Sequence, residues 1–372
     1  MRTLRALIRF LIVAVVVCTL AACSSSGSGP KASPASASAP TVTTTTVAPT
    51  RVPTRVAFTP AAKPLAPSST TYVYSFGSGG RTRSYRLHVP PAAAEGKPLP
   101  LVLNLAGATQ NGLLQEAQSG MDASSDRDGY LVAYPDGTRI SKVLTPDPVA
   151  KDAQYGFNAG YCCGDPSTNH VDDVDFLVAT ISNIASRAPV DLRRVYMTGM
   201  SNGGMMAYAM AAQAAMYIAA VASVSGQVEL PTIAPTRPVP TMEFHSVDDP
   251  IARFNGVKNA DPKLVFSVMD GIGQWVKVDG CDPTPHVGKK IVGTGASAGL
   301  TATLVTYTGC RAGASVNLWR LTGSGHVWPG APFNTGPKDT WILDGVGRGT
   351  QLIDANELMW KFFEQHTLPS AP

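Results

Sequence analysis

The sequence has little net charge and no run of basic residues. Its 30 lysines and arginines nearly balance 26 acidic residues, which gives a formal net charge of +4. Residues 1–22 hold three arginines and no acidic residue, so the chain without them carries +1 (4 − 3). With no basic stripe, the surface offers nothing that would attract a phosphate backbone, and we do not expect nucleic acid as a partner.

A hydrophobic run long enough to cross a bilayer with confidence is also missing. The apolar run at residues 11–20 is short, follows Arg2, Arg5 and Arg9, and ends in Leu-Ala-Ala-Cys. Because these are the marks of a cleavable leader, residues 1–22 are predicted to be a signal peptide. Cysteine directly after Leu-Ala-Ala resembles the lipobox of bacterial lipoproteins, which predicts a diacylated Cys23 anchored in the membrane. The alternative is an ordinary secretory signal in which Cys23 is incidental.

The next segment has too little apolar surface to fold. Residues 24–67 consist mainly of Ser, Thr, Ala, Pro and Gly. Such a composition cannot offset the entropy of ordering, so residues 23–67 are predicted to be a lipidated cysteine followed by a disordered tether. Residues 68–368 remain, which is enough for one large domain with a single core, and they contain no internal repeat. The expected location is extracytoplasmic, lipid-anchored to the cell membrane or secreted.

Cysteines are few, and no zinc-like spacing joins them to histidine or aspartate. Six are present, of which Cys18 leaves with the signal peptide and Cys23 carries lipid. The others are Cys162, Cys163, Cys281 and Cys310, an even number for an oxidising compartment. We favour a Cys281–Cys310 disulfide, which closes a loop of about 30 residues and stabilises the fold by roughly 3–4 kcal/mol. The pairing of the adjacent Cys162 and Cys163 stays open, and no metal site is expected.

From residue 71 onward, short apolar runs alternate with helix-like segments. The expected strands are 71–76, 84–89, 99–105, 130–134, 195–198, 219–225, 239–245 and 316–321. The expected helices are 113–127, 172–185, 204–212 and 352–365. The first two strands, separated by Gly77-Ser78-Gly79-Gly80, read as a hairpin. The alternation that follows predicts an α/β fold with a mostly parallel sheet and helices on both faces.

One serine stands where such a fold presents a nucleophile. The pentad Gly199-Met200-Ser201-Asn202-Gly203 follows an apolar, β-branched run and precedes a helical segment. A serine in this strand–turn–helix context projects its hydroxyl from a sharp turn, and small neighbours allow the backbone to make that turn. Ser201 is therefore predicted to be a nucleophile.

Two further strand ends carry the partners that a serine nucleophile needs. Asp248 and Asp249 follow the strand 239–245, and His326 follows the strand 316–321. Parallel strands gather functional groups at their carboxyl ends, and the order serine, acid, histidine is that of the α/β-hydrolase fold. His326 is expected to move the proton, and Asp249, with Asp248 as the alternative, to orient the imidazole. His245, which precedes the acid, is interpreted as structural support for the acid loop.

A negative charge that develops on the substrate oxygen needs two backbone donors. One is expected to be the N–H of Asn202, immediately after the nucleophile. The other should come from the loop after the strand 99–105, where Ala108 is the candidate and Thr109 the alternative.

Six segments in sequence order resemble the polyhydroxybutyrate depolymerase-like esterases, a family with lipoprotein, feruloyl esterase and acetylxylan esterase members. They are residues 105–112, Tyr134-Pro135-Asp136-Gly137, Cys162-Cys163-Gly164, residues 171–174, the Ser201 pentad and residues 325–330. The resemblance implies a Ser-Asp-His carboxylic ester hydrolase without a cofactor. It supports Asp249, because the family's acid stands four residues after the strand-end histidine. The chain departs from the family pattern at Ala106, where histidine is usual, and at Ser246, where glycine is usual.

Several other residues have two readings. Asp172 and Asp173 could be catalytic carboxylates, but capping of a helix N-terminus explains them better. Trp328, Tyr161 and Phe157 are candidates for an aromatic platform that binds a phenolic acyl group or a sugar ring, and the alternative is that they fill the core.

The sequence as a whole predicts a membrane-anchored serine esterase that acts through an acyl-enzyme. The expected substrates are feruloyl or acetyl esters of plant polymers, or hydroxyalkanoate polyesters. The alternative is a non-catalytic binding lipoprotein that retains the hydrolase fold. In that case Ala106, where the family usually has histidine, would be an early sign that the catalytic site is being lost.

Overall fold

The computed structural model describes residues 69–140, 154–256, 267–331 and 345–369. The predicted signal peptide, Cys23 and the tether lie outside these residues. Among the described residues, no helix has both the length and the apolar character needed to span a membrane.

Within this described part, eleven strands form one sheet, with the order β1-β2-β4-β3-β7-β8-β9-β13-β12-β10 and β11 beside β12. The pairs from β4 to β13 are parallel, whereas β1, β2, β10, β11 and β12 pair antiparallel at the two edges. This order, with a parallel centre, is the α/β-hydrolase fold. The strands are β1 Thr70–Ser78, β2 Arg81–Val89, β3 Leu99–Leu105, β4 Leu131–Pro135, β7 Val190–Met200, β8 Ala220–Val224, β9 Thr241–Ser246, β10 His286–Val287, β11 Ile291–Val292, β12 Thr301–Tyr307 and β13 Val316–Thr322. A separate ribbon joins β5 Thr138–Arg139 to β6 Tyr155–Gly156.

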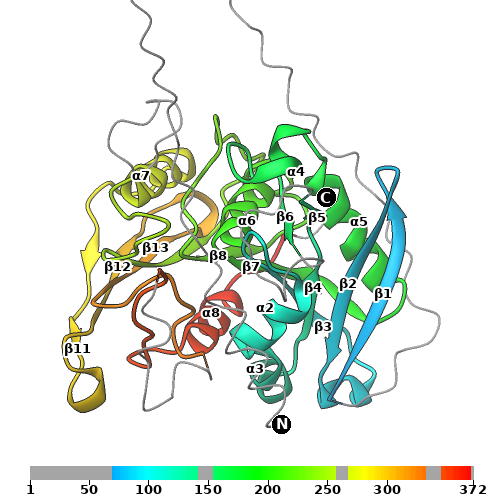
Figure 1. Ribbon diagram of the computed structural model, residues 1–372, viewed down its shortest axis with the longest axis horizontal. Coiled ribbons are helices and arrows are strands. Elements are labelled where there is room, and N and C mark those ends of the chain that lie inside the picture. Colours follow the sequence, from blue (N-terminus) through cyan, green and yellow to red (C-terminus); the bar gives the residue numbers. More distant parts are fainter. Residues whose placement is uncertain (1–68, 141–153, 257–266, 332–344, 370–372) are drawn as a thin grey trace, which may run out of the picture.

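Helices cover both faces of the sheet (Figure 1). They are α2 Gly112–Ser119, α3 Met121–Asp128, α4 Gly164–Thr168, α5 Asp173–Ala185, α6 Asn202–Gln213, α7 Val268–Asp279 and α8 Ala355–Phe363, with short 3-10 turns at Pro91–Glu95, Gly295–Ser297 and Arg311–Gly313. In β3, Leu101 and Leu103 pack with the helices α5, α6 and α7, while Val102 packs with α3 and α8. Successive side chains of a strand point to opposite faces, so a fully apolar strand such as β3 supplies both core layers.

The expected strands are present, with ends that differ by a few residues. The first hairpin is tighter than predicted, because β1 and β2 extend until only Gly79 and Gly80 remain between them, both with positive φ. The segment 113–127 is helical, as predicted, but it forms two helices instead of one. Gly120, with φ of 60°, ends α2 and starts α3. The helix α7 and the strand β12 were not predicted.

Candidate active site

Ser201 stands at the corner between β7 and α6 in a conformation that L-residues rarely adopt. Its φ and ψ are 53° and −120°, and its backbone N–H donates to Val224 O at 2.8 Å. Its own carbonyl accepts from Met205 N at 2.9 Å, which starts the helix. Strain of this kind persists only where the surroundings enforce it, and it is common at functional sites. Here it holds a half-buried serine at the end of a central strand.

Glycines make this corner possible through close approach of the backbone. A Cβ atom on Gly203 would lie 2.2 Å from Leu105 O, and one on Gly226 would lie 2.4 Å from Ser201 O. Neither distance is tolerable for carbon and oxygen. The turn therefore fits between the ends of β3 and β8 only because these positions have no side chain.

Asp249 and His326, from two different loops, form a hydrogen-bonded pair. Asp249 Oδ2 lies 2.8 Å from His326 Nδ1, and both residues are at most 5% exposed. Asp249 Oδ1 accepts the N–H groups of Ile251 at 2.8 Å and Ala252 at 2.9 Å. Burial raises the pKa of Asp249, but His326, His245 and these N–H groups outweigh it, so that the pKa lies below its ordinary value. Asp249 is therefore an ionised partner for the imidazole.

The neighbouring Asp248 has a different position. It is exposed, and its Oδ2 accepts from Gly323 N at 2.7 Å. Ser246, one of the departures from the family pattern, is buried nearby, where its hydroxyl donates to Ser324 O at 2.5 Å and accepts from Asp248 N at 3.2 Å. The serine side chain thus ties the acid loop to the histidine loop, which a glycine cannot do.

The loop that carries His326 is held from several sides. His326 N donates to Val346 O at 2.7 Å, and Trp328 Nε1 donates to Asn356 Oδ1 at 3.0 Å at the start of α8. The second ring nitrogen, Nε2, makes no hydrogen bond with the described residues. The loop thus fixes the ring through Nδ1 and leaves Nε2 able to exchange a proton with a reacting group.

The predicted oxyanion loop lies against Ser201. A Cβ atom on Gly107 would be 3.5 Å from the Cβ of Ser201. Thr109, with φ of 69°, already donates its N–H to Tyr155 O at 2.8 Å. Of the two predicted loop donors, Thr109 is therefore already bonded within the protein, and Ala108 is half-buried. Ala106, the other departure from the family pattern, is buried.

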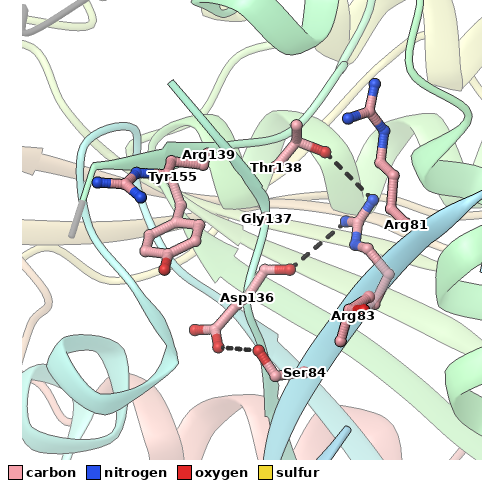
Figure 2. A pocket seen from close by; sticks show the side chains of 9 residues that line it. Arg81, Arg83, Ser84, Asp136, Gly137, Thr138, Arg139 and Tyr155 are labelled. Carbon is pink, nitrogen blue, oxygen red and sulfur yellow. Dashed lines mark hydrogen bonds between the residues drawn. The ribbon is translucent and has the colours of Figure 1, made fainter. Parts of the chain in front are cut away.

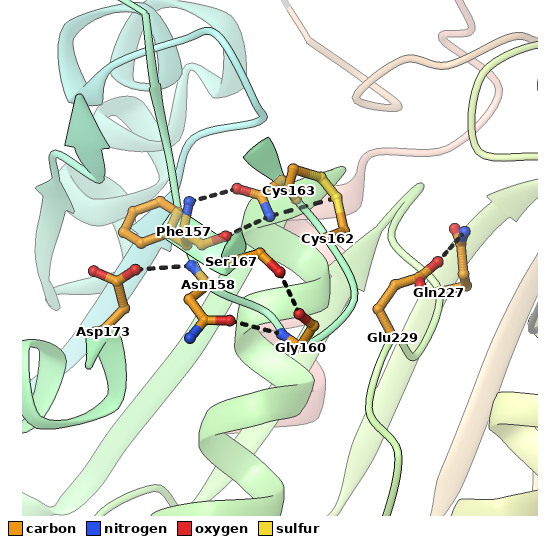
Figure 3. The surroundings of a disulfide bond; sticks show 10 residues. Phe157, Asn158, Gly160, Cys162, Cys163, Ser167, Asp173, Gln227 and Glu229 are labelled. Atoms are coloured by element: carbon orange, nitrogen blue, oxygen red, sulfur yellow. Dashed lines mark hydrogen bonds between the residues drawn. A yellow bond between two sulfur atoms is a disulfide. The ribbon is translucent and has the colours of Figure 1, made fainter. Parts of the chain in front are cut away.

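The side chain of Asn202 fixes the loop on the other side of Ser201. Its Oδ1 accepts from Phe157 N at 2.8 Å and its Nδ2 donates to Phe157 O at 3.0 Å. Nδ2 also lies 3.8 Å from Cys162 Sγ, and Cys162 is disulfide-bonded to Cys163 in the structure (Figure 3). The structure also joins Cys281 to Cys310. One side chain thus connects the serine corner to the segment that bears the adjacent cysteines.

The aromatic platform needs correction. Trp328 is 0% and Phe157 1% exposed, and both rings pack in the two core layers. Neither ring is available to a substrate, so the core reading applies to both. Only Tyr161, at 42% exposure, presents its ring to solvent.

The acidic pair at the start of α5 is structural. Asp172 caps the helix by accepting from Asp175 N at 2.9 Å, as predicted. Asp173, in contrast, is buried and forms an ion pair with Arg83 at 2.7 Å.

Arg83 also lines a pocket, together with Arg81, Asp136 and Tyr155 (Figure 2). None of the three predicted catalytic side chains lines this pocket. Asp136 accepts from Ser84 Oγ at 2.6 Å and Gly112 N at 2.8 Å, so this motif residue anchors the helix after the oxyanion loop.

Sequence reasoning missed one buried acid close to the site. Glu243 lies within β9 at 1% exposure and contacts His245. An ionisable residue inside an otherwise apolar strand was the available signal. Among the described residues, no cluster of His, Cys, Asp and Glu could hold a metal ion.

Residues 83–262 match the Esterase PHB depolymerase family. The chain is 32% identical over 302 residues to "Putative esterase NocK" of Nocardia uniformis subsp. tsuyamanensis, covering 77% of this chain and 82% of that protein. It is 27% identical to feruloyl esterase B of Piromyces equi over 62% of this chain, and it spans only 40% of that protein. A solved acetyl xylan esterase from Aspergillus awamori is 18% identical with a TM-score of 0.41, covering 69% of this chain and 94% of that one. The chain belongs to the Esterase PHB depolymerase family and is a carboxylic ester hydrolase.

Proposed function

We propose that this hydrolase is a serine esterase that works through an acyl-enzyme formed on Ser201. The observation that carries the proposal is the 2.8 Å contact between Asp249 and His326, at the same edge of the sheet as the strained Ser201 corner. A serine hydroxyl is a poor nucleophile at neutral pH, so it needs a base within reach and a carboxylate that stabilises the resulting imidazolium.

The proposed reaction has two halves. The Ser201 oxygen attacks the ester carbonyl while His326 Nε2 accepts its proton, and the tetrahedral intermediate collapses as His326 returns the proton to the leaving alcohol. Water then attacks the acyl-enzyme with His326 as the base and releases the acid. The N–H groups of Asn202 and Ala108 are proposed to hold the oxyanion, and each such donor lowers the barrier by about 3 kcal/mol. The bond between Thr109 N and Tyr155 O favours Ala108 as the loop donor.

The proposed substrates are feruloyl or acetyl esters, or hydroxyalkanoate esters. Relatives named as feruloyl esterases support the first group, and the family description supports the second. Tyr161, exposed on the segment that Asn202 anchors, is the proposed contact for a phenolic or sugar ring. Turnover of methyl ferulate, acetylated xylan and hydroxybutyrate oligomers would separate these classes. A Tyr161→Ala variant that loses only the ferulate activity would support the contact.

We further propose that the enzyme is extracytoplasmic and anchored through a lipidated Cys23. The support is the Leu-Ala-Ala-Cys sequence at the end of the apolar leader. In the native host, Cys23→Ser should move esterase activity from the membrane fraction to the soluble fraction. Activity that stays with the membrane would contradict the lipid anchor.

The decisive test of the mechanism is Ser201→Ala. We expect kcat/KM for a p-nitrophenyl ester to fall by about 10³-fold or more, and labelling by a fluorophosphonate probe to disappear. Ser75→Ala, at an exposed serine of the edge strand β1, is the matched control and should leave both unchanged. An active Ser201→Ala variant would remove Ser201 from the mechanism.

A further inference from the structure

A buried pair of ionisable side chains lies directly behind Asp249. His245 and Glu243 are 0% and 1% exposed, and His245 Nδ1 is 2.7 Å from Glu243 Oε1. The other ring nitrogen, Nε2, is 2.6 Å from Ala252 O and 3.6 Å from Asp249 Oδ2. The imidazole therefore bridges Glu243 and the loop that carries the acid.

The hydrogen-bond partners determine where the protons are. A backbone carbonyl only accepts, so Nε2 of His245 must carry a proton for Ala252 O. Burial raises the pKa of Glu243, and its hydrogen-bond donors act against that rise. The Tyr208 hydroxyl donates to Oε2 at 3.0 Å and the Gly226 N–H to Oε1 at 3.3 Å, and both donors favour the carboxylate. A carboxylate facing Nδ1 requires a proton there as well. With Glu243 ionised, His245 carries a proton on both ring nitrogens and is an imidazolium.

The direction in which the pKa of His245 is shifted agrees with this charge. Burial lowers the pKa of His245, but its hydrogen bond to Glu243 and the charges of Glu243 and Asp249 outweigh burial and raise it. The ring of Phe254, 5.9 Å away between centroids, meets the imidazole edge-on and adds no charge. Arg320, the neighbour of His245 in strand register on β13, is exposed, as is Asp248. The charged groups that face His245 are thus Glu243 and Asp249, with His326 beyond Asp249.

We propose that Glu243 and His245 are positioning residues that set the basicity of the Asp249–His326 pair. The imidazolium of His245 holds the acid loop through Ala252 O, keeps Asp249 ionised and offsets part of the negative charge that Asp249 presents to His326. Glu243 contacts Nδ1 of the His245 ring, whereas Asp249 lies near Nε2. The positive charge of His245 is therefore closer to Asp249 than the negative charge of Glu243 is, and it dominates there. The proposal rests on the hydrolytic roles proposed above for Asp249 and His326.

The test is Glu243→Gln, which keeps the shape of the side chain. The glutamine amide can donate to Nδ1, so His245 becomes neutral and still donates to Ala252 O. The negative charge of Asp249 is then no longer offset by His245, so His326 should bind a proton more readily. The acidic limb of the pH profile of kcat/KM should therefore move to higher pH by about half a unit or more. A folded variant with a slower rate but an unmoved limb, or a limb moved to lower pH, would overturn the proposal.

Asp279→Asn is the matched control, because Asp279 is a buried carboxyl at the other end of β9. It should leave the acidic limb in place. Tyr208→Phe removes one donor to Glu243 and should move the limb in the same direction as Glu243→Gln, by less. A Tyr208→Phe profile that does not move, or moves the other way, counts against the proposal.

The protonation of His245 can also be measured on the unmodified protein, with two variants used only to assign the signal. In ¹⁵N-histidine NMR at pH 8, His245 should appear as a ring with both nitrogens protonated, a signal that Glu243→Gln removes and His88→Asn retains. His88 needs this control because it also contacts acids, Asp122 at 3.6 Å and Asp126 at 2.8 Å. The absence of such a ring overturns the proposal. Failure of the esterase proposal is distinguishable, since it would appear as an unmodified protein that neither hydrolyses esters nor reacts with the fluorophosphonate.

Discussion

A buried aspartate lies near each end of strand β9, and the pKa values of the two carboxyl groups shift in opposite directions. Asp249, beyond the carboxyl end, is surrounded by His326, His245 and two N–H donors, and its pKa is lowered. Asp279, beside the start of the strand, is buried with one N–H donor from Val239, and burial raises its pKa to about 7 against the weaker pull of two arginines. Burial alone neutralises a carboxyl group. A carboxylate remains ionised in the interior only where donors and an imidazole converge on it.

The two halves of the candidate site, the acid–histidine pair and the Ser201 corner, also differ in what holds them in place. Side-chain hydrogen bonds hold the acid–histidine half, whereas the serine half depends on backbone conformation and on glycines that allow close approach. A substitution should therefore damage each half through a different physical effect. The variants below test this difference.

The largest effect is expected for Asp249→Asn. Asparagine can still accept from Ile251 and Ala252, but it presents no charge to His326 and favours the wrong tautomer of the ring. We expect kcat/KM to fall by about 10³- to 10⁴-fold with little change in thermal stability. Asp248→Asn is the matched control and should cost at most a few-fold. Equal losses in the two variants would refute the assignment of the acid.

The serine half should fail by steric overlap. In Gly203→Ala the new methyl group meets Leu105 O at 2.2 Å, which should destabilise the fold by about 3 kcal/mol or more. Gly77→Ala in β1 provides the control, because nothing lies within 4 Å of its Cβ position. Urea denaturation of both variants measures the difference. A Gly203→Ala protein as stable as Gly77→Ala would show that the corner can relax.

The contrast between the two aspartates predicts opposite pH dependence. For Asp279 the pKa is about 7 in the folded state and near 3.8 when unfolded, so the folded state binds more protons between these values. Its contribution to stability is therefore present below about pH 4 and is lost as the pH rises through 7. Relative to the unmodified protein, Asp279→Asn should gain about 2 kcal/mol in unfolding free energy between pH 4 and pH 8. Parallel stability curves for the two proteins would contradict this.

The smallest effect is expected where the chain departs from its family. Ser246→Gly restores the usual residue and removes the hydroxyl that joins Ser324 O to Asp248 N. We expect a loss of about 1 kcal/mol in stability and less than a tenfold loss in kcat/KM. Calorimetry and ester hydrolysis measure the two changes. An unchanged melting temperature would show that the bridge between the loops adds nothing.

Much of the fold could be predicted because its signals are local. Buried strands of a parallel sheet are continuous apolar runs, and β3 begins and ends where the run 99–105 does. The missed helix α7 also had a local signal, a capping box in which Ser267 and Asp270 bond each other's backbone N–H groups. The break in the helix predicted for 113–127 depended on Gly120 taking positive φ, and an isolated glycine in a helical pattern does not establish that conformation.

The sequence by itself determined the order of serine, acid and histidine, the strand–turn–helix setting of Ser201 and the family, because each is a pattern of neighbouring residues. Only the tertiary structure decided that Asp249 faces His326 while Asp248 faces Gly323 N, and that Trp328 and Phe157 fill the core. The physical reason is that burial, hydrogen bonding and charge are set by what comes together from distant strand ends. The sequence names each group but not the neighbours that give it its chemistry.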